Sequence, residues 1–201
     1  MYYAIFDTTW GAFGFAELNS RVLATFLPRA RQEIIRALRA SWPDAIDAPD
    51  SLPRFRQAVV DYFEGKRTRF PIDIDLSGMP PFHQLVLEAC RRIPYGHTAS
   101  YADLAKAVGK PNAARAVGGA MARNPLPLVV PCHRVLHTDG SIGGFSSTGG
   151  VDEKAQLLQL EKAALGRYVD GAAIRATTGL AFARSKGVSG KRRPAVVVSV
   201  R

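Results

Sequence analysis

The 201-residue sequence contains only two cysteines, and they form no repeated or paired motif. This scarcity excludes a disulfide-stabilised secreted scaffold and favours a reducing compartment. No apolar run reaches the roughly 20 residues that a membrane-spanning helix needs. Asp7 interrupts the N-terminal segment too early for a secretory signal peptide. We therefore expect a cytoplasmic protein with no membrane partner.

Acidic side chains are also few: 17 Asp and Glu stand against 27 Lys and Arg, which gives a net charge of +10. The excess is uneven, because residues 167–201 hold 8 Lys/Arg and 1 Asp, a charge of +7 that leaves +3 for residues 1–166. The charge favours a polyanion such as nucleic acid as partner without locating its site. With 47% hydrophobic residues the chain is predicted to be globular and long enough for one domain or two small ones.

Residues 1–78 are predicted to form a small α/β domain. Alternation of apolar residues, turn residues and helical spacing give, in order, strands 2–7, 12–17 and 22–27, a helix over 29–41, a second helix capped by Ser51, and a strand over 70–76. The apolar stripe of the second helix contains Phe55, Val59, Tyr62 and Phe63. No group in this domain has an evident chemical role, so its aromatic residues are interpreted as core.

Residues 79–166 are predicted to be mostly helical. The first helix, 82–93, carries Cys90 within an apolar stripe, which is typical of a structural thiol. Ser100 and Asp103 have the spacing of a capping box that opens a helix over 101–108. Asn112 is then expected to cap a second helix over 113–123. Two short helices joined by a tight turn are a helix-turn-helix candidate.

The second of these helices has almost no bulky side chains, since most of its positions are Ala or Gly: Ala113, Ala114, Ala116, Gly118, Gly119, Ala120 and Ala122. Each glycine inside a helix costs about 1 kcal/mol relative to alanine. Such a slim helix lets another backbone approach closely, with Arg115 projecting from its first turn. Tight packing against another helix, with a solvated Arg115, is the alternative.

The segment from Asn124 to Arg134 ends in a buried apolar run followed by Pro131, Cys132 and His133. A thiol becomes a nucleophile as the thiolate, and a neighbouring base or cation favours that form. Cys132 is therefore the candidate nucleophile and His133 the candidate base. The alternative is a small core cysteine beside an unrelated histidine.

Further along the chain, a hairpin is expected to turn at Asp139–Gly140, followed by a glycine-rich loop over 143–150 that fits no nucleotide-binding motif. Asp152 is predicted to cap a last helix whose apolar face carries Ala155, Leu158 and Leu165. Glu161 lies on that same face, and a buried carboxylate needs a partner, for which His133 is the candidate. Partial exposure of Glu161 beside Lys162 is the alternative.

The segment from Ile93 to Glu161 resembles the O6-alkylguanine-DNA alkyltransferases, also called methylated-DNA–protein-cysteine methyltransferases. The matching motifs are ordered along about seventy residues: Ile93-Pro-Tyr-Gly, Ser100-Tyr101, Ala113 to Met121, Asn124-Pro125, Pro131-Cys-His-Arg-Val135, Gly143-Gly-Phe145, and Lys154 through Leu157-Leu158 to Glu161.

The resemblance implies an α/β fold class with three parts. A small ribonuclease-H-like domain would cover residues 1–78, and a mostly helical, winged helix-turn-helix-like catalytic domain residues 79–166. Residues 167–201 would be a basic extension that contacts phosphates or only aids solubility.

The resemblance also implies the chemistry. Cys132 would accept the alkyl group from O6-alkylguanine, and from O4-alkylthymine as a further substrate, in a single irreversible turnover. His133, acting through water and polarised by Glu161, would take the thiol proton. Tyr101 would donate a proton to guanine N3, and Asn124 would order the turn that holds the cysteine.

The implied partner is double-stranded DNA with the damaged base flipped out of the helix. Arg115 would fill the vacated space while the slim helix lies in the minor groove. The expected DNA-binding residues are Arg115, Ala113, Ala114, Gly118, Gly119, Arg123 and Arg134. The expected base pocket is formed by Met121, Pro127, Val135, Phe145 and Ser146, with Phe145 standing where the family commonly has Tyr.

No cofactor is implied, and no structural zinc is expected because no cysteine precedes Cys90. A monomer, associated with the nucleoid when on DNA, is expected. Three other functions fit parts of the sequence: a damage-binding protein without transfer activity, a helix-turn-helix regulator, and a Cys-His hydrolase or redox enzyme. Cys132 argues against the first, the scarcity of base-reading side chains against the second, and Arg115, Tyr101 and the basic charge against the third.

Overall fold

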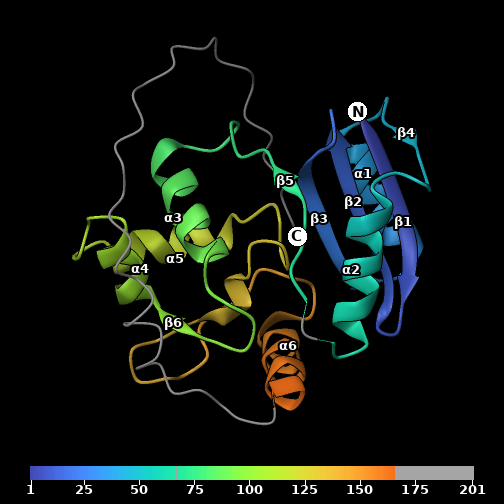
Figure 1. Cartoon of the computed structure of the whole chain (residues 1–201). Coiled ribbons are helices and arrows are strands. Elements are labelled where there is room, and N and C mark those ends of the chain that lie inside the picture. Colours follow the sequence, from blue (N-terminus) through green and yellow to red (C-terminus); the bar gives the residue numbers. More distant parts are fainter. Residues whose placement is uncertain (67, 166–201) are drawn as a thin grey trace.

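The computed structural model describes residues 1–66 and 68–165, so the predicted basic extension lies outside the described residues. The chain folds into a mixed sheet with helices on both faces and a helical half beside it (Figure 1). This arrangement confirms the predicted α/β class.

The sheet has five strands in the order β4-β1-β2-β3-β5. Its core is the predicted antiparallel meander, in which each strand pairs with the next, and two short strands add in parallel at the edges. The strands are β1 Tyr2–Thr8, β2 Gly11–Leu18, β3 Arg21–Arg29, β4 Ile46–Asp47 and β5 Asp73–Ile74. The expected strand over 70–76 is thus reduced to two paired residues.

One helix covers each face of the sheet. Helix α1, Arg31–Ser41, packs on the face where β2 presents small residues, and a β-carbon on Gly14 would lie 2.5 Å from Cγ2 of Ile34. Helix α2, Pro53–Phe63, packs on the opposite face against Phe13 and Phe15. Alternation of Phe with Ala or Gly along β2 therefore sets how near each helix lies.

The helical half contains α3 Pro81–Arg91, α4 Tyr101–Ala107, α5 Ala114–Ala122 and α6 Gly150–Leu165, a 3₁₀ turn η1 at Cys132–Arg134, and the parallel pair β6 Ala99–Ser100 and β7 Val135–Leu136. The capping box predicted at the start of α4 is present in full, because Ser100 and Asp103 each bond the other's backbone N–H. Cys90 on α3 is fully buried, as expected of a structural thiol.

Four local expectations were wrong. Asp152 does not cap α6, because that helix already begins at Gly150 and Asp152 lies in its first turn. Ser51 does not cap α2; its hydroxyl donates to Glu17, and the residue before the helix is Leu52, with a φ of +50°. Asn112 does not cap α5, whose N-cap is Ala113. The turn at Asp139–Gly140 exists but joins no hairpin, because β7 pairs with β6.

The buried face of α6 also differs from the prediction. It carries Lys154, Leu157 and Glu161, whereas Ala155 and Leu158 are only partly buried. The expected face carried Glu161 with apolar residues, but it did not include Lys154, whose ammonium has an internal partner in the carbonyl of Val135. The side chain of Leu165, also expected on this face, lies outside the described residues. The prediction that Glu161 points inward was correct.

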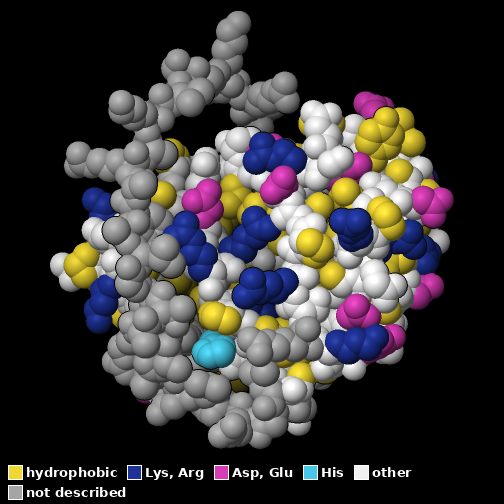
Figure 2. Space-filling view, in the orientation of Figure 1, with side chains coloured by type: hydrophobic (Ala, Val, Ile, Leu, Met, Phe, Trp, Pro, Cys, Tyr) yellow, Lys and Arg dark blue, Asp and Glu magenta, His cyan; other side chains and the backbone are white. Residues whose placement is uncertain are grey.

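The two halves share one hydrophobic core, which continues from Phe13 and Phe55 under the sheet to Val117 and Leu157 among the helices. Across the described residues, no helix has the length and apolar character to cross a bilayer. Figure 2 shows Lys and Arg side chains in the middle of the visible face, with some Asp and Glu side chains among them. The described part of this face is therefore mixed in charge.

Candidate active site

Cys132 begins the 3₁₀ turn η1 and is held by Asn124. The Asn124 side-chain nitrogen donates to Sγ of Cys132 at 3.1 Å and to the carbonyl of Val130 at 2.9 Å, while its oxygen accepts the N–H of Leu126 at 3.0 Å. One amide thus fixes both ends of the loop that leads to the sulfur. The placement agrees with the role expected for Asn124.

The loop before Cys132 is core rather than strand. Leu128, Val129 and Val130 are buried, and Leu128 has a φ of +78°, outside the β region. Strand β3 supports this loop from the sheet, because the Thr25 N–H donates to the carbonyl of Pro125 at 3.0 Å and its hydroxyl to the carbonyl of Pro127 at 2.6 Å.

His133 and Glu161 meet in the interior, as the helical spacing predicted. Nε2 of His133 lies 2.8 Å from Oε1 of Glu161, and Nδ1 is buried with no protein partner among the described residues. Burial lowers the pKa of His133 against the opposing attraction of Glu161. A neutral imidazole held by one nitrogen has the other available as a base.

Glu161 is surrounded by donors although it is only 1% exposed. Arg134 donates to both carboxylate oxygens at 2.8 to 3.1 Å, and the N–H of Gly96 donates to Oε2 at 2.9 Å. Burial opposes ionisation of this carboxyl, but His133 and Arg134 outweigh it and hold its pKa well below the ordinary value. The carboxylate is therefore an anion in the folded protein.

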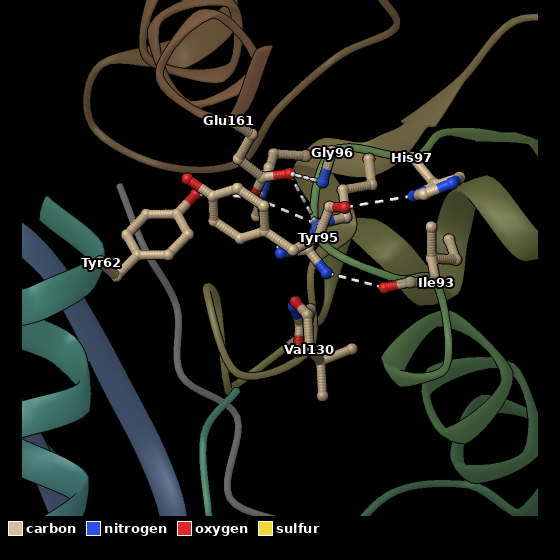
Figure 3. A network of polar contacts seen from close by, with 10 residues as sticks. Tyr62, Ile93, Tyr95, Gly96, His97, Val130 and Glu161 are labelled. Carbon is tan, nitrogen blue, oxygen red and sulfur yellow. Dashed lines mark hydrogen bonds and ion pairs between the residues drawn. The ribbon is translucent and has the colours of Figure 1, made fainter. Parts of the chain in front are cut away.

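Tyr62 completes this network from the other half of the molecule. Its hydroxyl donates to Oε1 of Glu161 at 2.8 Å and lies 3.4 Å from Nε2 of His133. Figure 3 shows Tyr62 from α2 and Glu161 from α6 pointing toward one another. The sequence prediction missed this contact because Tyr62 looked like one more core aromatic.

Arg134 was expected at the DNA, and this expectation was wrong. Its side chain turns inward with η1, is 7% exposed, and bonds Glu161 and the carbonyl of Ile93, the latter at 2.7 Å. A guanidinium engaged in this way cannot also reach a phosphate at the surface. Arg134 is instead the main counter-charge of Glu161.

Lys154 brings a second cation into the interior beside the cysteine. The side chain is fully buried, its ammonium donates to the carbonyl of Val135 at 2.6 Å, and it lies 5.8 Å from the centre of the Tyr101 ring. Burial raises the pKa of the Cys132 thiol, while the Asn124 hydrogen bond and the charge of Lys154 lower it. The thiol at rest is thus protonated, with groups nearby that stabilise its anion.

Cys132 lines a cavity of about 570 Å³ whose walls include both helices of the helix-turn-helix candidate. The lining includes Tyr101 from α4, Arg115, Gly118 and Met121 from α5, and Phe145. The glycine-rich loop over 143–150 packs closely on Tyr101, because a β-carbon on Gly143 would lie 2.5 Å from the Tyr101 hydroxyl oxygen. The structure therefore brings the predicted nucleophile, tyrosine and arginine to a single space.

A second cavity, of about 1160 Å³, reaches Cys132 from the side of β3 and is also lined by Pro127, Phe145 and Ser146. Four of the five expected pocket residues line one cavity or both. Val135 lines neither, since its side chain is fully buried and its carbonyl accepts the Lys154 ammonium.

The remaining residues expected at the DNA lie on or beside α5. Arg115 and Arg123 are exposed, and Ala113, Ala114, Gly118 and Gly119 are partly exposed. Arg123 bonds the carbonyl of Gly119 at 3.2 Å. Within residues 1–66 and 68–165, no cluster of His, Cys, Asp or Glu has the arrangement of a metal site.

Comparison with known proteins shows which family the chain resembles. Residues 81–163 match the family described as 6-O-methylguanine DNA methyltransferase, DNA binding domain. The constitutive methylated-DNA–protein-cysteine methyltransferase of Bacillus subtilis is 36% identical over 166 residues, which cover 80% of this chain and 95% of the relative. The protein of that name from Mycobacterium leprae is 50% identical over 101 residues, which span 50% of this chain and 59% of the relative.

Solved structures agree. The crystal structure of Mycobacterium tuberculosis OGT in complex with DNA has a TM-score of 0.70 and 34% identity, covering 82% of this chain and 94% of that one. The O6-methylguanine-DNA methyltransferase of Pyrococcus kodakaraensis has a TM-score of 0.55 and 29% identity, covering 80% and 98%. The chain belongs to the family of methylated-DNA–protein-cysteine methyltransferases.

Proposed function

We propose that this protein repairs DNA by direct reversal, transferring the alkyl group of O6-alkylguanine irreversibly to Cys132. The observation that carries the proposal is the shared cavity: Cys132, Tyr101 and Arg115 line one space beside the slim helix α5. The names of the relatives support the same reaction. We extend the substrates to O4-alkylthymine as the family resemblance suggests.

The reaction is a displacement at the alkyl carbon. The Cys132 proton passes through a water molecule to Nδ1 of His133, the ring nitrogen with no protein partner among the described residues. The sulfur then forms a bond to the alkyl carbon while the bond from that carbon to guanine O6 breaks. The product thioether has no route back to the thiol, so each molecule acts once.

Tyr101 would supply the other proton. Its hydroxyl lines the cavity, and burial raises its pKa, which keeps it a donor at neutral pH. Protonation of guanine N3 lets the base leave as a neutral molecule and not as an anion. The electron pair from the broken bond returns to O6.

DNA would dock on α5, whose Ala and Gly residues let the duplex approach closely. Gly118 has no atom within 4 Å of an added β-carbon, so this face is open in the free protein. Arg115, exposed at the mouth of the cavity, would occupy the space that the flipped base leaves. Arg123 and the small residues from Ala113 to Gly119 would contact the backbone.

We further propose that residues 1–78 form a ribonuclease-H-like domain and residues 79–166 a winged helix-turn-helix-like catalytic domain. The antiparallel meander with α1 and α2 on its faces supports the first assignment, and the α4–α5 pair supports the second. The cytoplasmic location, the monomeric state and the phosphate-binding role of residues 167–201 stay predictions.

The deciding experiment is intact-mass spectrometry after incubation with an oligonucleotide containing O6-methylguanine. A gain of one methyl group, mapped to Cys132 and absent in Cys132→Ala, is expected. The Cys132→Ala variant should bind the same DNA with unchanged affinity. Binding of damaged DNA with no mass gain by the unaltered protein would instead indicate a damage-binding protein.

A further inference from the structure

The Tyr62 side chain has a single polar atom, its hydroxyl oxygen. This oxygen reaches the candidate active site from the sheet half of the molecule. The side chain is 0% exposed on α2, and its ring packs edge-on against Phe63 at 5.2 Å and Tyr95 at 5.7 Å between ring centres. These contacts fix the ring and with it the position of the hydroxyl oxygen. It is directed at the pair formed by His133 and Glu161.

The hydrogen-bond donors around Glu161 determine the role of the Tyr62 hydroxyl. Three donors converge on Oε1: the Tyr62 hydroxyl, Nε2 of His133 and the Arg134 guanidinium. An ionised carboxylate only accepts, so Nε2 must carry the imidazole hydrogen and Nδ1 must carry the lone pair. The Tyr62 hydroxyl shares Oε1 with Nε2 and so takes part of the negative charge that His133 would otherwise experience.

We infer that Tyr62 is a positioning residue of the proton relay: its hydroxyl orients the Glu161 carboxylate toward His133 and limits how far the negative charge of that carboxylate favours the protonated imidazole. The inference rests on the proposed alkyl transfer, in which neutral His133 takes the Cys132 proton. A Glu161 without this donor would attract a proton onto His133 more strongly, and the base would be occupied at a higher pH.

The other charges around His133 do not substitute for this hydroxyl. Lys154 reaches the region from the same helix as Glu161, and Arg134 follows His133 in the chain. Both are cations, and they disfavour the protonated form of His133 whether or not the Tyr62 hydroxyl is present. Tyr62 is the donor to Glu161 that comes from the sheet half, so it also ties the relay to α2.

The test compares Tyr62→Phe with Tyr95→Phe. Tyr95 is the matched control, because its hydroxyl is buried nearby and has no hydrogen-bond partner among the described residues. Single-turnover alkyl transfer is measured for both variants and the unaltered protein from pH 4.5 to 8.5. We expect the acid limb of the Tyr62→Phe profile to move up by about one pH unit, which is a roughly tenfold lower rate on that limb.

Above the limb the Tyr62→Phe rate should lie within about threefold of the unaltered rate, and Tyr95→Phe should match the unaltered profile throughout. A uniform loss at every pH would reduce Tyr62 to a structural role and overturn the inference. So would an unchanged profile. If the unaltered protein transfers no alkyl group, the proposed function itself fails.

A second readout is independent of activity. The ¹⁵N chemical shifts of His133 report which ring nitrogen carries hydrogen and at what pH the ring becomes charged. We expect the Nε2–H form in the unaltered protein and a titration about one unit higher in Tyr62→Phe. Coincident titrations in the two proteins would refute the inference even if the variant reacted slowly.

Discussion

At the scale of single residues, the site depends on one buried anion. Glu161 is stable as a carboxylate because donors from four residues in three segments reach it: Tyr62, Gly96, His133 and Arg134. Removing a partner from such a group leaves the opposite charge buried without compensation, which costs far more than an exposed ion pair contributes. The energetics of the relay and of the fold are therefore coupled at this position.

Glu161→Gln should lower the free energy of unfolding by about 3–5 kcal/mol at pH 7, because Arg134 then keeps its charge without a carboxylate.

The unaltered protein should lose stability on acidification in two steps. Its His133 pKa lies below the ordinary 6.5, so the unfolded chain takes up a proton more readily as the pH falls through that value. The depressed Glu161 pKa adds a second loss below about 4.5.

Urea unfolding from pH 3 to 8 measures both steps. The loss below about pH 4.5 should be smaller in Glu161→Gln, which has no carboxyl at this position to protonate. Parallel curves for the two proteins over that range would show that Glu161 is not the anion described here.

Arg115→Ala should slow repair of O6-methylguanine in duplex DNA by about tenfold or more, because extrusion of the base loses its support. The reaction with free O6-benzylguanine, which needs no extrusion, should keep its rate. Arg123→Ala is the matched comparison, since Arg123 is exposed at the C-terminal end of the same helix but does not line the cavity that Cys132 shares with Tyr101. Equal losses with both substrates would place Arg115 in the chemistry instead.

Residues that are neighbours in sequence were the easiest to predict. Cys132 and His133 are adjacent, and Glu161 follows from helical spacing, so their pairing could be proposed without coordinates. Tyr62 is separated from Glu161 by 99 positions and sits in an apolar stripe, where nothing distinguishes its hydroxyl. Arg134 was expected at the DNA from the family resemblance, but the 3₁₀ turn η1 directs its side chain inward to Glu161.

At the scale of elements, a face made of backbone and small side chains decides what can approach. Helix α5 carries small residues where it borders the cavity, and the loop over 143–150 has a glycine, Gly143, where it contacts Tyr101. Both features were visible as Ala and Gly in the sequence. The sequence did not show which groups pack against these small residues, because that depends on which element lies opposite in the fold.

The loop makes the clearer test. Gly143→Ala should slow alkyl transfer several-fold, because the added carbon would stand 2.5 Å from the Tyr101 hydroxyl oxygen and 3.1 Å from Nε2 of His137. Gly144→Ala makes the same change one position later, where no atom lies within 4 Å. Single-turnover rates and melting temperatures are measured for both variants. Gly143→Ala should transfer the alkyl group more slowly than Gly144→Ala. Indistinguishable rates would mean that Tyr101 can shift without consequence.

Helix α6 shows why helical periodicity alone fell short. Helical spacing placed Glu161 on the inner face correctly, but it assigned the rest of that face to Ala155 and Leu158, whereas the structure buries Lys154. Each of these charges has a partner outside the helix, the carbonyl of Val135 for the ammonium and Arg134 for the carboxylate. The partner of Lys154 is a backbone carbonyl, so burial of this ammonium becomes predictable only once the tertiary fold places that carbonyl.

At the scale of the whole molecule, the sheet half contains no residue expected to touch the damaged base, yet it holds the site at two points. Tyr62 reaches the relay from α2, and Thr25 on β3 bonds the loop before Cys132. A shared hydrophobic core joins the same two halves. The sheet half therefore acts as a support that fixes the position of the sulfur.

Thr25→Val tests this support, since valine keeps the shape and removes the hydroxyl that donates to the carbonyl of Pro127. Thr9→Val is the control, because its hydroxyl donates to the carbonyl of Phe63 within the sheet half. Each loss should lower the free energy of unfolding by about 1 kcal/mol. Only Thr25→Val should also slow alkyl transfer, by several-fold, because the carbonyl it frees belongs to the loop that Asn124 fastens to Cys132. Equal rates in the two variants, at equal stability, would show that the sheet half stabilises the fold without positioning the nucleophile.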